Sequence, residues 1–409
     1  MIDVIDLVLT VLGLVLAVPT GMLLLECVVA VLPWPRRSAP PVQRDPLLRA
    51  VVLVPAHDEA EGIAATVAAL ASELGPHDRV LVVADNCTDD TAARARDAGA
   101  RTVERHDPER RGKGYALRFA VEQLAADPPD VIVIVDADCR MRPGSLAVLV
   151  ARAASEGRPI QARFAMHAPN RHPRALVSEL AVIVRNHVRL LGMRRLGMPC
   201  HMTGSGMAFP WPVLRDTPPM AGNIVEDLML GIAVALQGHP PAYCPEAEVV
   251  SLLPDRGDAA FGQRRRWEHG QIETLLSHAP RLMAAGVRRG RLHLFVLGLD
   301  LAIPPTALLT TLLGLGTAVS GVVALLGPVR PLMVWGSGLA ALALAIVLAW
   351  ARYARDRIPL AALTTVPRYL LWKLPMYAAF ALGRRQRSWD RTARPDDVVQ
   401  RLDRKRTSD

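Results

Sequence analysis

The 409-residue chain contains three lysines beside 45 arginines, and few of its residues are aromatic. Its five cysteines form no C-x-x-C pair and no paired spacing, which disfavours a zinc site and predicts reduced thiols in a cytoplasmic domain. These are Cys27, Cys87, Cys139, Cys200 and Cys244. No aromatic-rich RNA-binding motif and no internal repeat of fixed period are present.

Two nucleotide-binding motifs are also missing. No G-x-G-x-x-G follows the first strand-like run, which disfavours a dinucleotide dehydrogenase. Gly112-Lys113-Gly114 lacks the earlier glycine and the Ser/Thr of a P-loop, which disfavours an ATPase. The net charge of +9 would suit nucleic-acid binding, because basic clusters neutralise phosphates. However, the basic clusters near the C-terminus adjoin apolar segments, so we expect membrane lipids as their partner and no nucleic acid.

Long apolar runs are present at both ends of the chain. Residues 5–32 are long enough for the roughly 20 residues that cross a bilayer, and no small-residue cleavage site follows them. They predict a membrane anchor, in which Glu26 reaches the interface or a neighbouring helix. Residues 292–326 predict one tilted span, or a span preceded by an interfacial turn. Residues 332–350 predict a further span.

Charge bias orients these segments. Asp3 and Asp6 lie at the start of the first run and Arg36 and Arg37 follow it, which predicts a multi-pass protein of the cell's inner membrane with its middle domain in the cytoplasm. Residues 358–382 are apolar enough to cross, but crossing would place the basic tail outside. They therefore predict a re-entrant or interfacial helix on the cytoplasmic face.

The middle of the chain alternates strand-like and helical patterns. The β-branched runs 50–54, 80–83 and 131–135 are typical of parallel strands buried on both faces, and residues 61–73 and 91–98 predict helices between strands. In open α/β sheets ligands bind at the carboxyl ends of the strands. Polar motifs follow all three runs there: His57-Asp58-Glu59, Asp85-Asn86 and Asp136-Ala137-Asp138.

Two of these motifs carry candidate ligands. Asp136 and Asp138 need a positive partner, such as Mg²⁺ or Mn²⁺ bridging to a diphosphate, although solvated turn residues are the alternative. Asp85 is suited to accept hydrogen bonds from a base or ribose. Its alternative role is a helix N-cap, which we prefer for Asp89 and Asp90.

Further charged groups follow along the chain. Lys113 lies between glycines that would let a point cation approach a phosphate, and the scarcity of lysine favours that function over a solvated loop. Glu226 and Asp227 begin a helical pattern. The helix dipole there favours their ionised forms and suits a general base, although acidic residues also favour helix starts structurally.

The most specific motif is Gln263-Arg264-Arg265-Arg266-Trp267. Arginine offers bidentate contact to a phosphate, and tryptophan offers a face for a sugar ring. A basic membrane-facing helix is the alternative for Arg264 and Arg265.

Taken in this order, the motifs resemble the family 2 glycosyltransferases with a GT-A fold, over roughly residues 50–270. The likeness is greatest to the membrane-integrated branch of cellulose, hyaluronan and poly-N-acetylglucosamine synthases and ceramide glucosyltransferases. Members are inverting enzymes that use a nucleotide-sugar, usually UDP-linked, and a divalent metal. The resemblance implies an α/β fold, in which a Rossmann-like GT-A cytoplasmic domain is flanked by transmembrane helices. The expected parts are an anchor (1–32), a linker (33–48), the GT-A domain (49–290), C-terminal transmembrane and interfacial helices (291–383) and a basic tail (384–409).

The resemblance also implies residue roles. Asp227, with Glu226 beside it, would be the catalytic base. Asp136 and Asp138 would hold Mg²⁺ or Mn²⁺. The nucleotide-sugar would contact Glu59, Asp85, Lys113, Asp136, Asp138, Gln263 and Arg266. The acceptor would contact Trp267 and the small residues Gly204 and Ser205. Val225 replaces the threonine of many synthases, which bears on the acceptor.

The expected function is therefore metal-dependent hexosyl transfer to a membrane-associated lipid or glycan, in cell-envelope glycolipid or polysaccharide biosynthesis. The first alternative is a processive synthase that exports its polymer, with a homo-oligomer or partner subunit completing the channel. The second is a non-catalytic scaffold, although every expected position is filled. The repeated spans and midplane binding features of transporters are absent from the sequence.

Overall fold

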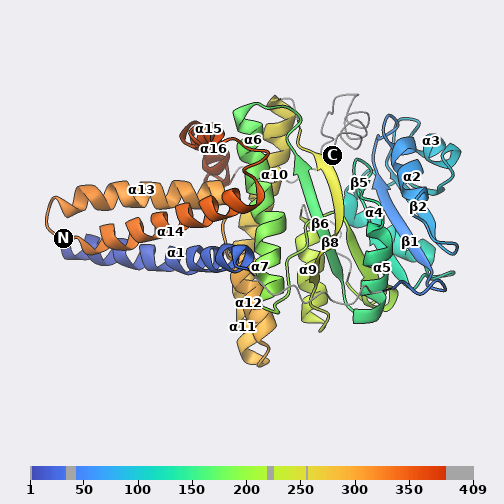
Figure 1. Cartoon of the computed structure of the whole chain (residues 1–409), viewed down its shortest axis with the longest axis horizontal. Helices are drawn as coiled ribbons and strands as arrows, with labels where there is room; N and C mark the ends of the chain where they lie inside the picture. The colour runs from blue at the N-terminus through green and yellow to red at the C-terminus, as the bar shows by residue number, and fades with distance from the viewer. Residues whose placement is uncertain (1, 34–42, 219–224, 255–256, 384–409) are drawn as a thin grey trace. The chain divides into compact units, whose positions relative to one another are not determined.

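The computed structural model describes residues 2–33, 43–218, 225–254 and 257–383, without the side chains of 257–260 and 263 (Figure 1). Within these residues the chain forms two compact units. The helical unit contains residues 2–33, 171–198 and 268–383, and the sheet unit contains 43–170 and the described part of 199–267. Most of the predicted linker and the basic tail lie outside the described residues.

The sheet unit is built on one eight-stranded mixed sheet with strand order β3-β2-β1-β4-β7-β6-β8-β5. Four parallel neighbours form one side: β3 (Arg101–Arg105), β2 (Arg79–Asp85), β1 (Ala50–Ala56) and β4 (Val131–Ile134). The other side contains β7 (Met207–Pro210), β6 (Ile160–His167), β8 (Ala242–Leu252) and β5 (Arg140–Met141). Strand β7 runs antiparallel to both β4 and β6. The three predicted strands are confirmed as β1, β2 and β4.

Helices cover the central strands because those strands have no polar face. Alternate side chains of β1 and β4 join one core with helices α4 (Lys113–Leu124) and α9 (Glu226–Leu236). The intervening residues Val52, Val54 and Val133 are fully buried as well, as expected for strands buried on both faces. The unit also contains α2 (Ile63–Ala71), α3 (Thr91–Asp97), α5 (Ser145–Glu156) and α8 (Trp211–Arg215).

The start of α3 corrects one prediction. Asp90 occupies the N-cap position but its side chain makes no capping hydrogen bond. Instead, Asp89 Oδ1 accepts from the backbone N–H of Thr91 at 3.0 Å. The carboxylate that accepts this hydrogen bond at the start of α3 therefore belongs to Asp89, one residue before the N-cap position.

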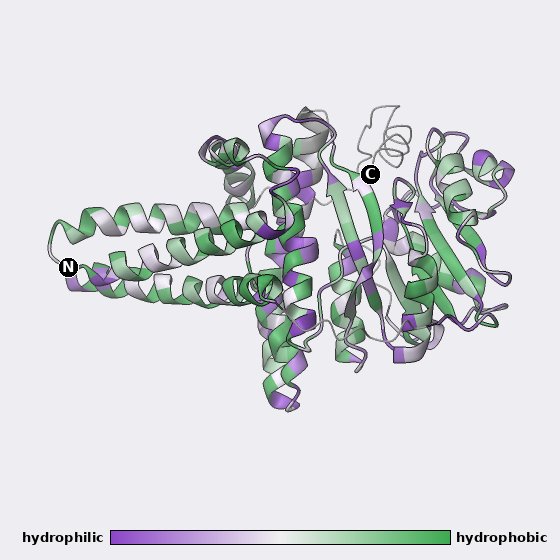
Figure 2. Ribbon diagram, viewed as in Figure 1, coloured by the Kyte–Doolittle hydropathy of each residue, from purple (hydrophilic) through white to green (hydrophobic). Residues whose placement is uncertain are grey.

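The helical unit contains the apolar segments. Among the described residues, three helices are long and apolar enough to cross a membrane: α1 (Ile2–Val31), α13 (Thr306–Ala324) and α14 (Arg330–Tyr353). They lie side by side and are predominantly hydrophobic (Figures 1 and 2). Gly13 of α1 and Gly316 of α13 both pack against Trp335 of α14, where a Cβ on either glycine would collide. Small residues at such contacts are typical of helix packing in membranes.

The remaining apolar segments form shorter helices. The predicted run 292–326 divides into α12 (Leu292–Leu301) and α13, with Pro304 and Pro305 at the break. Residues 358–382 form α15 (Leu360–Leu363) and α16 (Val366–Ala381). With 16 residues, α16 is shorter than the roughly 20 that a span requires, and its interfacial position stays a prediction.

Residues 171–198 join the helical unit through buried charges. They form α6 (Pro173–Ile183), the π-helix η1 (Val184–Arg189) and α7 (Leu190–Arg195). Arg189 Nε donates to Glu26 Oε2 at 3.0 Å, and its Nη2 donates to Asp300 Oδ1 at 2.6 Å. Glu26 thus reaches a neighbouring helix, as one of the predicted alternatives has it. The predicted 49–290 boundaries do not coincide with the units, because 171–198 and 268–290 pack with the terminal helices.

Candidate active site

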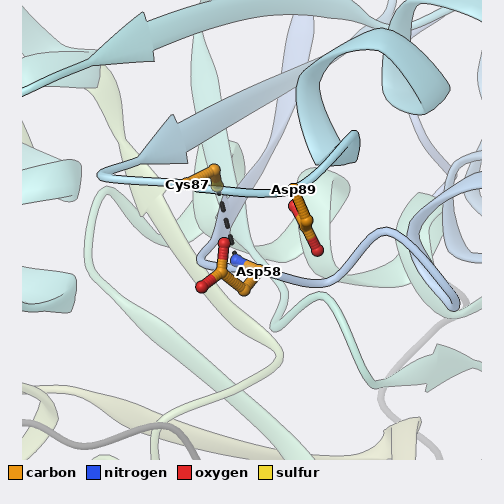
Figure 3. Close-up of side chains that lie close together, drawn as sticks. All are labelled: Asp58, Cys87 and Asp89. Atoms are coloured by element: carbon orange, nitrogen blue, oxygen red, sulfur yellow. Dashed lines mark hydrogen bonds between the residues drawn. The ribbon is translucent and has the colours of Figure 1, made fainter.

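Acidic residues after β1 and β2 hold two loops together. Figure 3 shows Asp58, Cys87 and Asp89, whose possible ligand atoms lie within 4.8 Å of one another. Asp58 Oδ1 accepts from Thr88 N at 2.6 Å, and Asp58 N donates to Cys87 Sγ at 3.4 Å. Asp89 Oδ2 accepts from Ala60 N at 3.1 Å. Because these groups bind loop backbone, we assign the cluster to loop structure.

Asp85 lies at the end of β2, as predicted, but it is paired within the protein. Arg105 Nη1 lies 2.6 Å from Asp85 Oδ1, and both side chains are largely buried. His57 Nδ1 lies 2.7 Å from the Asp85 carbonyl oxygen. Arg105 was not predicted, because its pairing depends on the parallel register that places it opposite Asp85. Glu59, the other predicted residue here, donates its backbone N–H to Thr91 Oγ1 at 2.7 Å.

Lys113 lies at the centre of the predicted acidic cluster. Its Nζ is 2.5 Å from Asp136 Oδ1 and 3.6 Å from Glu226 Oε1, and it donates to the Gly204 carbonyl oxygen at 2.5 Å. The start of α4, the end of β4, the loop before β7 and the start of α9 therefore meet at one ammonium group. The solvated-loop alternative for Lys113 is wrong.

The charges of this cluster shift the pKa values of its members. Burial raises the pKa of Glu226 to about 7, although the neighbouring Lys113 opposes the shift. Burial lowers the pKa of Lys113, but Asp136 and Glu226 outweigh it, and the net pKa is above the ordinary value. Desolvation therefore outweighs the expected stabilisation of ionised Glu226 by the helix dipole.

A buried glutamine fixes the loop that contains Gly204 and Ser205. Gln161 Oε1 accepts from Thr203 N, and Gln161 Nε2 donates to the Ser205 carbonyl oxygen, each at 2.9 Å. Ser205 Oγ in turn accepts from Asp136 N at 3.1 Å. Gln161 was missed by sequence reasoning, because nothing in the β6 pattern shows that one polar side chain bridges this loop.

Asp227 faces the same loop. Gly204 has a φ of +96°, and a Cβ placed there would lie 3.4 Å from Asp227 Oδ2. Glycine is favoured here because the left-handed backbone strains other residues. Asp227 also stands in the first turn of α9, whose predicted start the structure confirms. Its carboxylate and the Lys113 ammonium thus both lie close to Gly204.

Asp136 and Asp138 have the chemistry of a site for a hard cation. One ligand atom each from Asp136, Asp138 and Cys139 lies within 4.8 Å of the others. Ser251 Oγ donates to Asp138 Oδ2 at 3.0 Å, which orients that carboxylate. Carboxylate oxygens suit Mg²⁺ or Mn²⁺, whereas the buried Cys139 thiol is a softer donor. The two aspartates therefore fit the implied metal.

Helix α10 (Gly257–Ser277) carries the predicted arginine and tryptophan motif. Arg266 and Trp267 are half-buried on it. The side chain of Gln263 lies outside the described residues. The roles of all three stay predictions.

Residues 49–270 match the glycosyltransferase like family 2. The chain belongs to this family. The match covers more than half of the sequence and contains every site residue named above. The predicted α/β GT-A fold is confirmed, and the protein is a family 2 glycosyltransferase. No curated protein matches it significantly.

The glycosyltransferase is also similar to solved structures. One is the mannosyltransferase PcManGT from Pyrobaculum calidifontis in complex with GDP-Man and Mn²⁺, at 20% identity and a TM-score of 0.52, covering 86% of this chain and 100% of that one. Another is glucosyl-3-phosphoglycerate synthase from Mycobacterium tuberculosis in complex with Mn²⁺, UDP and phosphoglyceric acid, at 22% identity and a TM-score of 0.37, covering 56% and 78%. The first likeness supports the fold, and the second is too distant to add to it.

Proposed function

We propose that this glycosyltransferase is a membrane-bound inverting enzyme. It moves a sugar from a nucleoside-diphosphate sugar, with UDP as the expected nucleotide, to a hydroxyl of a membrane-associated lipid or glycan. The observation that supports this most strongly is the meeting of Lys113, Asp136 and Glu226 beside the Asp227 carboxylate. GDP-Man and Mn²⁺ in PcManGT are in keeping with a nucleotide-sugar donor and a metal.

Asp227 is the proposed general base. As the acceptor hydroxyl oxygen bonds to the anomeric carbon, its proton passes to the Asp227 carboxylate, and the bond from that carbon to the diphosphate oxygen breaks. Attack opposite the leaving group inverts the anomeric centre. Gly204 has no side chain between its backbone and Asp227 Oδ2, so the acceptor can approach closely. Ser205 and Trp267 are proposed to contact the acceptor.

The leaving diphosphate develops negative charge that cations must stabilise. Lys113 supplies one positive charge, and Arg266 is proposed to supply a second through bidentate contact. Asp136 and Asp138 would hold Mg²⁺ or Mn²⁺, which would supply further positive charge for the leaving diphosphate. Glu59, Asp85 and Gln263 are proposed to bind the nucleotide portion of the donor.

The membrane placement rests on the three candidate spans and on charge bias. We place the sheet unit in the cytoplasm at the inner membrane, where nucleotide-sugars are found. An acceptor at the membrane surface accounts for an apolar anchor on a transferase. We therefore assign the product to cell-envelope glycolipid or polysaccharide.

The test uses the full chain, purified in detergent with native lipids. UDP- and GDP-linked sugars are screened for release of the nucleoside diphosphate, with Mg²⁺, with Mn²⁺ and after chelation. We expect metal-dependent release from one donor, lost in Asp227→Asn and kept in the matched exposed variant Asp216→Asn. A long polymeric product would support the processive alternative. Neither release nor binding of any donor would overturn the proposal.

A further inference from the structure

The second lysine among the described residues, Lys373, pairs with a carboxylate next to the arginine and tryptophan motif. Lys373 of α16 is buried and ion-paired with Glu268 Oε1 of α10, and Tyr377 donates its hydroxyl to Glu268 Oε2 at 2.5 Å. Both oxygens of one buried carboxylate are thus held by two residues of α16. Glu268 directly follows Trp267 in the sequence.

Neighbouring contacts reinforce this attachment. Lys373 Nζ lies 4.9 Å from the centre of the Tyr369 ring, and Ser178 Oγ of α6 donates to the Tyr369 hydroxyl at 3.1 Å. His269 Nε2 lies 2.9 Å from the Met376 carbonyl oxygen. Two successive residues of α10 are therefore tied to α16, which fixes the rotation of α10 about its own axis.

Because α10 is one continuous helix, its rotation also sets the orientation of the arginine and tryptophan motif that it carries. It runs without interruption from Gly257 to Ser277, and each residue turns the helix by about 100°. By this spacing Gln263, Arg266 and Trp267 fall on one side of the helix. Glu268 and His269 fall on the opposite side. The contacts that hold Glu268 and His269 on one side of α10 therefore set the orientation of the side that carries Arg266 and Trp267.

We propose that Lys373 is a positioning residue for sugar transfer: through Glu268 it fixes the rotation of α10 and thereby aims Arg266 and Trp267. The inference rests on the proposed function, because it assumes that these two residues serve the diphosphate and the acceptor. It goes further, in that it assigns a role to a lysine outside the family match.

A charged pair suits this task better than apolar packing. Apolar contacts stabilise without direction, whereas a carboxylate held at both oxygens accepts one arrangement of donors. Replacing a buried ion pair by apolar residues of similar volume is often neutral for stability. One variant can therefore remove the directional ion pair and still keep the stability of the fold.

The test is the double variant Glu268→Leu/Lys373→Met, compared with the wild type and with Ser178→Ala. The last variant removes a neighbouring hydrogen bond and leaves the ion pair intact. We expect the double variant to keep a near-wild-type Tm and to lose about 100-fold in kcat, since small misplacements of catalytic groups have effects of that size. Donor KM is expected to change much less. Ser178→Ala is expected to match the wild type.

Two further readouts decide the outcome. In an Arg266→Ala/Trp267→Ala background the double substitution is expected to cause little additional loss, because Lys373 acts through these two residues. Full additivity of the two losses would overturn the inference. Backbone hydrogen exchange across residues 262–270 is expected to accelerate in the double variant, and unchanged exchange there would also overturn it. A wild type without transferase activity would contradict the proposed function, while exchange would still decide whether Lys373 orders α10.

Discussion

Lys113 and Lys373 are both ion-paired, yet their surroundings differ. The Lys113 side chain is 14% exposed, and its partners Asp136 and Glu226 are 28% and 14% exposed. These partners come from a strand end and a helix start. The Lys373 side chain is 6% exposed, and its partner Glu268 is held again by Tyr377 between two helices. The first site is open to a ligand, and the second is closed by its own hydrogen bonds.

The difference shows two uses of a rare residue. Arginine supplies 45 of the 48 lysine and arginine side chains, so each lysine is an exception to the usual basic residue of this chain. A compact ammonium fits a small enclosed site and accepts partners from several directions, whereas a guanidinium is planar and wider. At Lys113 one cation faces two acids, which leaves an excess of negative charge. At Lys373 the ion-paired carboxylate is that of Glu268, and the two charges balance.

The largest expected effect comes from removing the first lysine. Lys113→Met is expected to lower kcat/KM by roughly 100- to 1000-fold, because it removes a cation from the diphosphate and leaves two acids unpaired. Steady-state kinetics with the accepted donor measure this. The matched single variant Lys373→Met is expected to lower Tm more than Lys113→Met does. Equal losses of activity and of Tm in the two variants would contradict the distinction between an open site at Lys113 and a closed site at Lys373.

A second effect follows from the burial of Glu226 beside Lys113. The pKa of Glu226 is raised to about 7, so between about pH 4.5 and 7 the folded protein holds a proton that the unfolded chain has released. Stability therefore falls as pH rises through this window. Relative to Glu226→Gln, the wild type is expected to lose up to about 3 kcal/mol. Denaturant unfolding at pH 5 and pH 8 checks this, with the exposed Glu122→Gln as control. A wild-type slope in Glu226→Gln would assign the pH dependence elsewhere.

The smallest effect separates the two sites by size. Lys113→Arg keeps the charge at an open site, and we expect about a 10-fold loss of activity with Tm almost unchanged. Lys373→Arg enlarges a side chain in a closed site, and we expect a loss of about 1–3 kcal/mol in stability from overpacking. Unfolding curves and initial rates of the two variants measure both quantities. The reverse pattern would mean that Lys113 lies in the closed site.

Much of the sheet unit can be predicted from the sequence, because the patterns that indicate its strands and helices are local. β-branched runs mark β1, β2 and β4, and the start of α9 follows from Glu226 and the apolar pattern after it. Lysine scarcity singles out Lys113. Lys373 carried the same signal, but its partner Glu268 is 105 residues away, and no local pattern connects them.

Other features were missed for related reasons. Arg105 pairs with Asp85 through strand register, and Gln161 fixes the Gly204 loop from strand β6. The membership of residues 171–198 in the helical unit depends on Arg189 finding Glu26 and Asp300. The raised pKa of Glu226 reflects burial that the sequence does not show. In each case the decisive contact joins distant parts of the chain.

The central claim is that Asp136, Asp138 and Lys113 together bind a nucleoside diphosphate with a divalent metal. Calorimetric titration of UDP and of GDP into the purified full chain, with and without Mn²⁺, tests it most directly. We predict that one nucleotide binds only with Mn²⁺, and that Asp138→Asn abolishes this binding while Asp58→Asn, in the loop cluster, keeps it. Binding that is indifferent to Mn²⁺ and to Asp138 would contradict the claim.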